Sequence, residues 1–192
     1  MNRREFFSSA LAACFSAANL RAEEAHPFSG LIDINTGQNF RAQNGVFNLT
    51  LFMTAQQYYD SCGGSFIGVR QVVFETNAHD RIQPLLIMPR VTDQIDPSDL
   101  RNLARAQDSD AGFKILTGDL ESVMSATNAV DGAFFNLNGQ GKVSDHTLNA
   151  FLMTPSGNML INHLADDYFT YINLVERVMQ QCKLRHNRHL CL

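Results

Sequence analysis

The chain has 192 residues and a formal net charge of −4, and 45% of its residues are hydrophobic while 18% are charged. This balance is typical of one globular domain with a sizeable core. Lysine and arginine form no long cluster outside the two termini, so nucleic acid is not an expected partner. No apolar run is long enough to predict a transmembrane helix in the mature protein.

Residues 1–22 have the pattern of an export signal. Arg3 and Arg4 precede a run of small and apolar residues at 8–18, and the sequence around the arginine pair resembles a twin-arginine signal. The alternative, that these residues form the basic first turn of a genuine helix, stays open. Export would deliver the protein to a compartment that permits disulfides, and we expect it to be periplasmic.

Two cleavage sites are compatible with this signal. Residues 20–22 (LRA) form a passable site for ordinary signal peptidase, which would leave a soluble protein. Residues 11–14 (LAAC) resemble a lipobox, which would attach a lipid to Cys14 and give the protein its membrane contact. We favour ordinary cleavage, followed by a linker at residues 23–28.

The first half of the expected domain, which spans residues 29–182, alternates strands and a helix. Residues 31–39 alternate and then turn, which predicts an edge hairpin. The apolar runs at 46–53 and 83–88 suit strands that are covered on both faces. Between them, helical spacing of apolar residues predicts a helix over residues 61–77.

The second half continues the alternation and ends in a hairpin and a helix. Asp96 and Pro97 predict a helix start. The later segments are a strand at 113–116, a helix at 117–129, a Gly- and Asn-rich loop at 136–144, strands at 147–153 and 158–164, an amphipathic helix from 168, and a basic tail at 183–192. Strands that alternate with helices predict a parallel core. The predicted fold is therefore α/β and thioredoxin-like: a mixed sheet flanked by helices, with an N-terminal β-hairpin.

Several short segments occur in an order that resembles a known family. They are Asp60-Ser61-Cys62 at the end of 52–62, a strand-to-helix stretch at 89–106, Leu-Thr-Gly at 116–118, Asp-His-Thr at 145–147, and Thr-Pro-Ser-Gly at 154–157. Together with the opening hairpin, they resemble the Sco/SenC family of thioredoxin-like copper chaperones over nearly all of the mature chain.

The resemblance implies a copper site made from a C-x-x-x-C pair and a distal histidine. Cys62 matches the second cysteine and His146 the histidine, whereas Tyr58 stands at the position of the first cysteine and Gly63 replaces the proline that follows the second. A dithiol cycle at this site is therefore excluded. One thiolate and one imidazole could still hold Cu(I), because thiolates select soft metals. The implied function is copper delivery to a respiratory oxidase or another copper enzyme.

Two other functions stay open. Cys62 could serve a thiol–disulfide oxidoreductase, with Cys182 or Cys191 as the resolving thiol. A peroxidase is disfavoured, because Ala55 and Tyr59 stand where such enzymes have proline and threonine. A metal-free scaffold that binds a protein partner is the third possibility, in which Cys62 is a small residue at a helix start.

The C-terminal tail carries a second group of possible ligands. They are Cys182, His186, His189 and Cys191. These side chains could form a second metal cluster, but a Cys182–Cys191 disulfide or a frayed basic tail explains the same residues. If Cys14 leaves with the signal, three cysteines remain, so at least one thiol is unpaired within the monomer.

Overall fold

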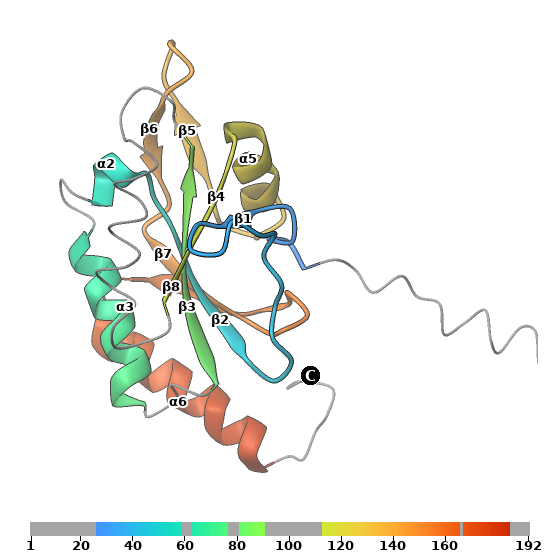
Figure 1. The fold of residues 1–192 in the computed structure, drawn as a ribbon. Coiled ribbons are helices and arrows are strands. Elements are labelled where there is room, and N and C mark those ends of the chain that lie inside the picture. The colour runs from blue at the N-terminus through green and yellow to red at the C-terminus, as the bar shows by residue number, and fades with distance from the viewer. Residues whose placement is uncertain (1–25, 59–62, 77–80, 91–112, 166, 185–192) are drawn as a thin grey trace, which may run out of the picture.

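The structure is a computed structural model that describes residues 26–58, 63–76, 81–90, 113–165 and 167–184 (Figure 1). Its elements, in chain order, are β1 (Ile32–Asp33), β2 (Phe47–Phe52), α2 (Ala55–Gln57), α3 (Gly63–Glu75), β3 (Ile82–Pro89), β4 (Lys114–Gly118), α5 (Leu120–Asn128), β5 (Phe135–Leu137), β6 (Val143–His146), β7 (Asn149–Met153), β8 (Met159–Leu164) and α6 (Tyr168–Leu184).

A mixed six-stranded sheet forms the centre of the molecule, in the order β1-β4-β3-β2-β7-β8. Strands β2, β3 and β4 are parallel, whereas β1 pairs antiparallel with β4, and β7 pairs antiparallel with both β2 and β8. All six residues of β2 are buried, as expected for a strand covered on both faces. The predicted α/β class, with a parallel core and a late antiparallel hairpin, is confirmed.

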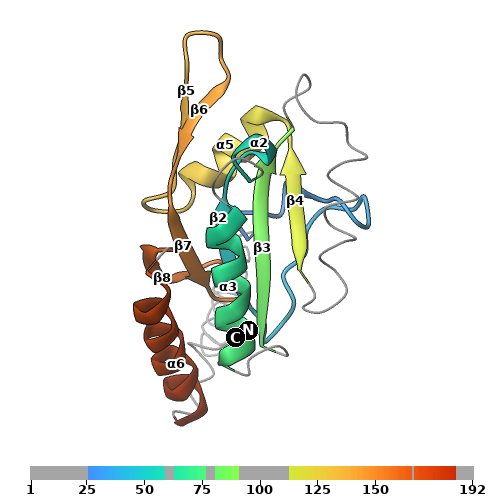
Figure 2. The ribbon, with the colours of Figure 1, turned by 90° about the vertical axis from the view of Figure 1, so that its left-hand side faces the viewer.

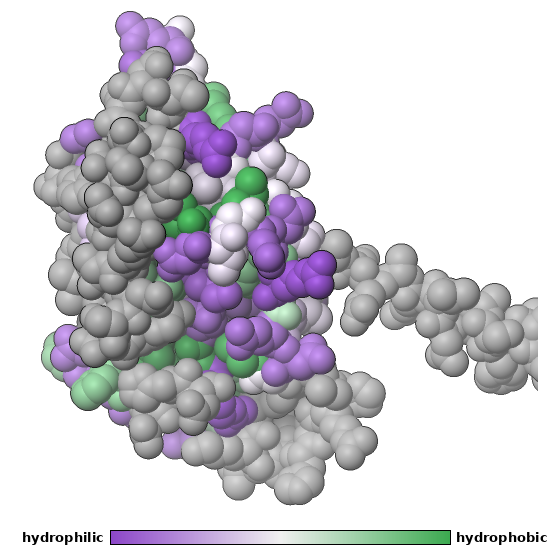
Figure 3. Space-filling model, in the orientation of Figure 1, coloured by the Kyte–Doolittle hydropathy of each residue, from purple (hydrophilic) through white to green (hydrophobic). Residues whose placement is uncertain are grey.

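The sheet separates two hydrophobic clusters. Helices α3 and α6 cover one face, which we call the α3 face; α5 and the segment that precedes β2 cover the other, the α5 face (Figures 1 and 2). Side chains alternate between the faces along β2: Leu49 and Leu51 belong to the α3 face, whereas Phe52 belongs to the α5 face. On the side drawn in Figure 3, the described hydrophobic residues are scattered among polar ones.

The prediction of a loop at residues 136–144 is wrong, because β5 and β6 form a hairpin there. They pair as a separate two-stranded sheet that projects from the body of the domain (Figures 1 and 2). The asparagine and glycine residues that suggested a loop gather in its turn: Asn138 Oδ1 accepts the N–H groups of Gln140 and Lys142 at 2.9 and 3.0 Å, and Gly141 has φ +74°. Residues 136, 137, 144 and 145 are exposed, so no apolar alternation marked these strands.

The N-terminal boundary also differs from the prediction. The predicted linker includes residues 26–28, yet Phe28 is fully buried in the α5-face cluster. Phe28 therefore belongs to the packed domain and not to a linker. At the other end, α6 continues through Leu184, and the remaining tail lies outside the described residues.

Two of the other predicted helices are observed, and a third lies outside the described residues. The helix expected at 61–77 is observed as α3, and that expected at 117–129 as α5. Thr117 belongs to β4, and Asp119 caps α5 by accepting the N–H of Ser122 at 2.8 Å. The helix expected from Asp96 lies outside the described residues. None of the described helices has the length and apolar character that a membrane span requires.

Candidate functional site

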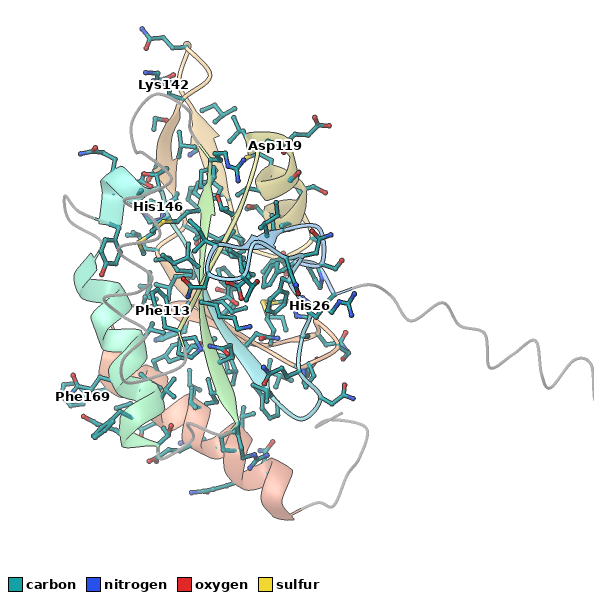
Figure 4. All side chains as sticks on the ribbon, viewed as in Figure 1. His26, Phe113, Asp119, Lys142, His146 and Phe169 are labelled. Carbon is teal, nitrogen blue, oxygen red and sulfur yellow. The ribbon has the colours of Figure 1, made fainter. Side chains whose placement is uncertain are left out.

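The strand register places His146 at the end of the sheet where the chain leaves β2. Thr50 pairs with Phe151 in antiparallel register, so the residues that precede β7 lie beyond the last residue of β2. From that same end the chain passes through α2 and continues to the first residue of α3. Figure 4 shows His146 at this end of the molecule, together with α2. The structure therefore brings His146 to the end of the sheet from which α3 starts.

The imidazole of His146 is buried and oriented by its surroundings. The residue is 4% exposed, and Nδ1 lies 2.8 Å from the carbonyl oxygen of Thr147. A carbonyl oxygen only accepts hydrogen bonds, so Nδ1 carries the hydrogen. In the neutral ring the lone pair is then on Nε2, the arrangement that second-shell carbonyls impose on metal-binding histidines.

The β5–β6 hairpin supports this ring. Phe135 and His146 are paired across the hairpin, and their ring centroids are 6.4 Å apart. Phe135 in turn packs edge-on against Phe52, the last residue of β2, at 6.2 Å. The hairpin that the sequence did not predict therefore joins His146 to the end of β2.

The candidate thiol ligand lies outside the described residues. Cys62 immediately precedes Gly63, the first residue of α3, but residues 59–62 are not described. The pairing of its sulfur with His146 Nε2 therefore remains a prediction. Among the described residues, no group of three or more His, Cys, Asp and Glu side chains could hold a metal ion.

Tyr58, which the resemblance places at the position of the first cysteine, is partly buried. Helix α2 is a single turn with a capping box: Thr54 Oγ1 accepts the Gln57 N–H at 3.1 Å, and Gln57 Oε1 accepts the Thr54 N–H at 2.8 Å. Tyr58 caps the end of this turn and is partly buried against the α3-face cluster. The helical turn therefore ends at a residue whose side chain packs against the α3-face cluster.

The second cysteine candidate lies at the far end of the molecule. Leu164 pairs with Asn149, so α6 begins at the His146 end of the sheet, as α3 does. Both helices run from there to the opposite end (Figures 1 and 2). Seventeen residues of α helix span about 25 Å, which places Cys182, in the last turn, far from the start of α3. This disfavours Cys182 as a resolving thiol for Cys62. His186, His189 and Cys191 lie outside the described residues.

Two other histidines have defined partners. His163 Nε2 lies 3.0 Å from Asp167 Oδ2, and this hydrogen bond holds the pKa of Asp167 below its usual value. His26 is half-buried, and burial lowers its pKa to about 4. His26 carries no sequence signal of its own, because it lies in the predicted linker; the large apolar side chain of Phe28, two residues on, is the available signal of packing.

These elements define a thioredoxin-like domain with a buried, oriented imidazole at the end of the sheet where the first core helix starts. No protein-family model matches the chain, and no curated protein matches it. Among solved structures, copper-bound yeast Sco1 is similar, with a TM-score of 0.59 and 21% identity over 80% of this chain and 86% of that one.

Two further structures belong to the same family. A SCO1/SenC family lipoprotein from Bacillus anthracis has a TM-score of 0.61 and 15% identity, over 77% of this chain and 90% of that one. BsSco, a member of the Sco family of cytochrome c oxidase assembly proteins, has a TM-score of 0.54 and 14% identity, over 76% of this chain and 90% of that one. At these identities the likeness is one of fold, and the expected resemblance to Sco/SenC proteins is confirmed at that level.

Proposed function

We propose that this chain is an exported, Sco-like copper-binding protein that delivers copper to a respiratory oxidase or another copper enzyme. The observation that carries the proposal is His146: its ring is buried, its Nδ1 is held by the Thr147 carbonyl, and it lies at the end of the sheet from which α3 starts. The fold is shared with copper-bound yeast Sco1 and with the oxidase assembly protein BsSco.

The proposed ligands are the Cys62 thiolate and His146 Nε2. Cys62 precedes a 13-residue helix, and the partial positive charge at a helix N-terminus favours a thiolate. Thiolate and neutral imidazole together suit Cu(I), which accepts two ligands in a line. Tyr58 adds no soft ligand, because a phenol is hard and protonated at neutral pH. We therefore expect weaker binding than a site with two thiolates would give, and copper that is readily released.

A competition titration tests the site. The purified, reduced chain is titrated with Cu(I) in the presence of a competing chelator, and Cys62→Ser and His146→Ala are each compared with wild type. We expect each variant to lose at least about tenfold in affinity. His163→Ala is a matched control that should bind as wild type does. Urea unfolding of each variant separates lost ligands from lost structure.

The alternative function with an observation in its favour is a metal-free scaffold. Tyr58, which the resemblance places at the first cysteine position, packs partly buried against the α3-face cluster and offers no soft metal ligand. Equal Cu(I) affinity in wild type and in the Cys62→Ser, His146→Ala double variant would reject the proposed site. A chain that takes up no Cu(I) yet retains a protein partner would establish the scaffold.

Export and lipidation are part of the same proposal. The mass of the native protein, isolated from cells that make the full chain, distinguishes the two cleavage routes. Cleavage after residue 22 leaves a chain without Cys14, whereas the lipobox route leaves Cys14 as a lipid-modified first residue. An uncleaved chain in the cytoplasm would overturn the export part of the proposal.

A further inference from the structure

His26 fixes the first described residues to the α5 face. Its ring lies edge-on to Phe28 and Phe40, with centroids 4.9 and 5.3 Å away. Nε2 lies 3.2 Å from the side-chain amide of Asn48, a residue of the central strand β2 that is 1% exposed. The adjoining Pro27 covers the turn at Gly157 so closely that a Cβ on Gly157 would overlap Pro27 Cδ. Residues 26–28 thus form a strap, which we define by these residues.

The hydrogen bonds of the strap require a neutral ring. The N–H of Phe28 points at His26 Nδ1 at 3.2 Å, so Nδ1 must accept. The ring hydrogen is then on Nε2. The Asn48 amide oxygen accepts this hydrogen when the amide oxygen and nitrogen exchange places, because the two orientations of an amide have the same shape. A proton added to Nδ1 would face the Phe28 N–H, and two donors cannot share one hydrogen bond.

Charged groups of both signs lie around the strap. A hollow of about 450 Å³ separates the strap from α5, and Asp119 and Glu121 line its far wall. Arg41 lies next to Phe40 and, with Lys114, borders the surface near Asn48, so the β-strand side contributes cations. The turn at residues 154–158 contributes no charged side chain. Burial is accordingly the cause that lowers the pKa of His26, to about 4 from an ordinary 6.5.

We propose that His26 is an acid-sensitive latch, which holds the strap on the domain when neutral and releases it when protonated. Protonation removes the acceptor for the Phe28 N–H and places a charge between two aromatic rings. Release detaches His26 and Pro27 from Asn48 and the Gly157 turn. It frees the point at which the preceding residues join the domain, while the sheet stays folded.

The direction of the pH dependence follows from the lowered pKa. The docked strap favours the neutral ring, so docking is complete above the ordinary pKa of 6.5 and weakens as the pH falls toward about 4. Across that window, the ratio of docked to released strap falls by at most about tenfold for each pH unit.

Hydrogen exchange and NMR of the full chain test the latch. We expect the protection factor of the Phe28 amide to fall at least about tenfold between pH 7.5 and 4.5, while amides of β2 keep theirs. His26→Gln supplies a carbonyl acceptor that does not titrate, so protection of Phe28 should become independent of pH. His163→Gln, which replaces a histidine at the far end of the sheet, should respond to pH as wild type does.

The NMR titration of the His26 ring in the wild-type chain tests the latch independently, even if the strap of the His26→Gln variant does not pack on the domain. A carbon-bound ring proton of His26 that shifts with a midpoint near 4 to 5, together with loss of Phe28 protection, supports the latch. A midpoint near 6.5 with Phe28 still protected would overturn it, as would equal protection of Phe28 at pH 7.5 and 4.5.

Discussion

At the scale of single residues, buried polar groups differ in whether they have partners. Asp33 is 4% exposed, accepts the N–H of Asn35 at 3.0 Å, and lies 3.2 Å from Lys114 Nζ. The ion pair therefore holds β1 to β4 at the edge of the sheet. By contrast, the buried hydroxyl of Tyr171 has no hydrogen-bond partner among the described residues, and burial raises the pKa of this phenol well above its usual value.

Removing the cation of the ion pair should destabilise the fold. Lys114→Met leaves the Asp33 carboxylate buried without its counter-ion, and we expect the free energy of unfolding to fall by about 2 kcal/mol, less than for a fully buried pair because Lys114 is partly exposed. Urea unfolding measures this change. Lys142→Met, at the exposed hairpin, is the control and should change stability by less than about 0.5 kcal/mol. Equal effects of the two substitutions would contradict the role of the pair.

Removing the Tyr171 hydroxyl should do the opposite. A buried hydroxyl without a partner costs free energy, so Tyr171→Phe is expected to be neutral or to stabilise the fold by up to about 1 kcal/mol. Thermal unfolding of the two proteins at one pH tests this. A loss of more than about 1 kcal/mol would contradict this expectation.

The sequence identifies residue types better than it identifies their orientation. Cys62 and His146 could be proposed because thiol and imidazole carry the chemistry and occur in a recognisable order. The bond from Nδ1 to the Thr147 carbonyl depends on the bend between β6 and β7, and the contact with Phe135 depends on the register of a hairpin that no pattern revealed. His26 was missed because a histidine in an apparent linker carries no signal of burial.

At the scale of elements, strands buried on both faces were predictable and short exposed ones were not. The apolar runs at 46–53 and 83–88 correspond to β2 and β3, because both faces of each strand meet hydrophobic clusters. β5 and β6 have only three and four residues and are largely exposed. Helix α2 depends on reciprocal bonds between Thr54 and Gln57, and its three residues are too few to show a helical period.

The turn between β7 and β8 offers a test of strap packing. Gly157 has φ +89°, and a Cβ there would overlap Pro27; Gly141 has φ +74° with open space around it. Gly141→Ala should therefore lose only the about 1 kcal/mol that positive φ costs an L-residue. Gly157→Ala should lose more, because the strap must also move. Equal losses in urea unfolding would show that Pro27 does not press on this turn.

At the scale of the whole molecule, acid should lower the stability of the fold in two separate pH ranges. Folding favours the neutral His26 ring, so its contribution is complete above pH 6.5 and is lost as the pH falls toward 4. Hydrogen bonds to Ser122 and His163 hold the pKa values of Asp119 and Asp167 below their usual range, so their contributions are lost only at still lower pH.

His26→Gln should remove the first window and leave the second. We expect the stability of wild type to fall more than that of the variant between pH 7 and pH 5, and the two curves to run parallel below pH 4. Urea unfolding at a series of pH values measures both. Parallel curves over the whole range would mean that His26 does not contribute to acid sensitivity.

The strap joins the domain at the end of the central strand that lies far from His146. His26 contacts Asn48 near the start of β2, whereas His146 lies beyond the end of that strand, which is about 20 Å long. Any attachment made through the residues before His26 therefore joins the domain near the start of β2, at the opposite end of that strand from His146. The candidate imidazole and the point where the preceding chain enters the domain are thus separated by the full length of the central strand.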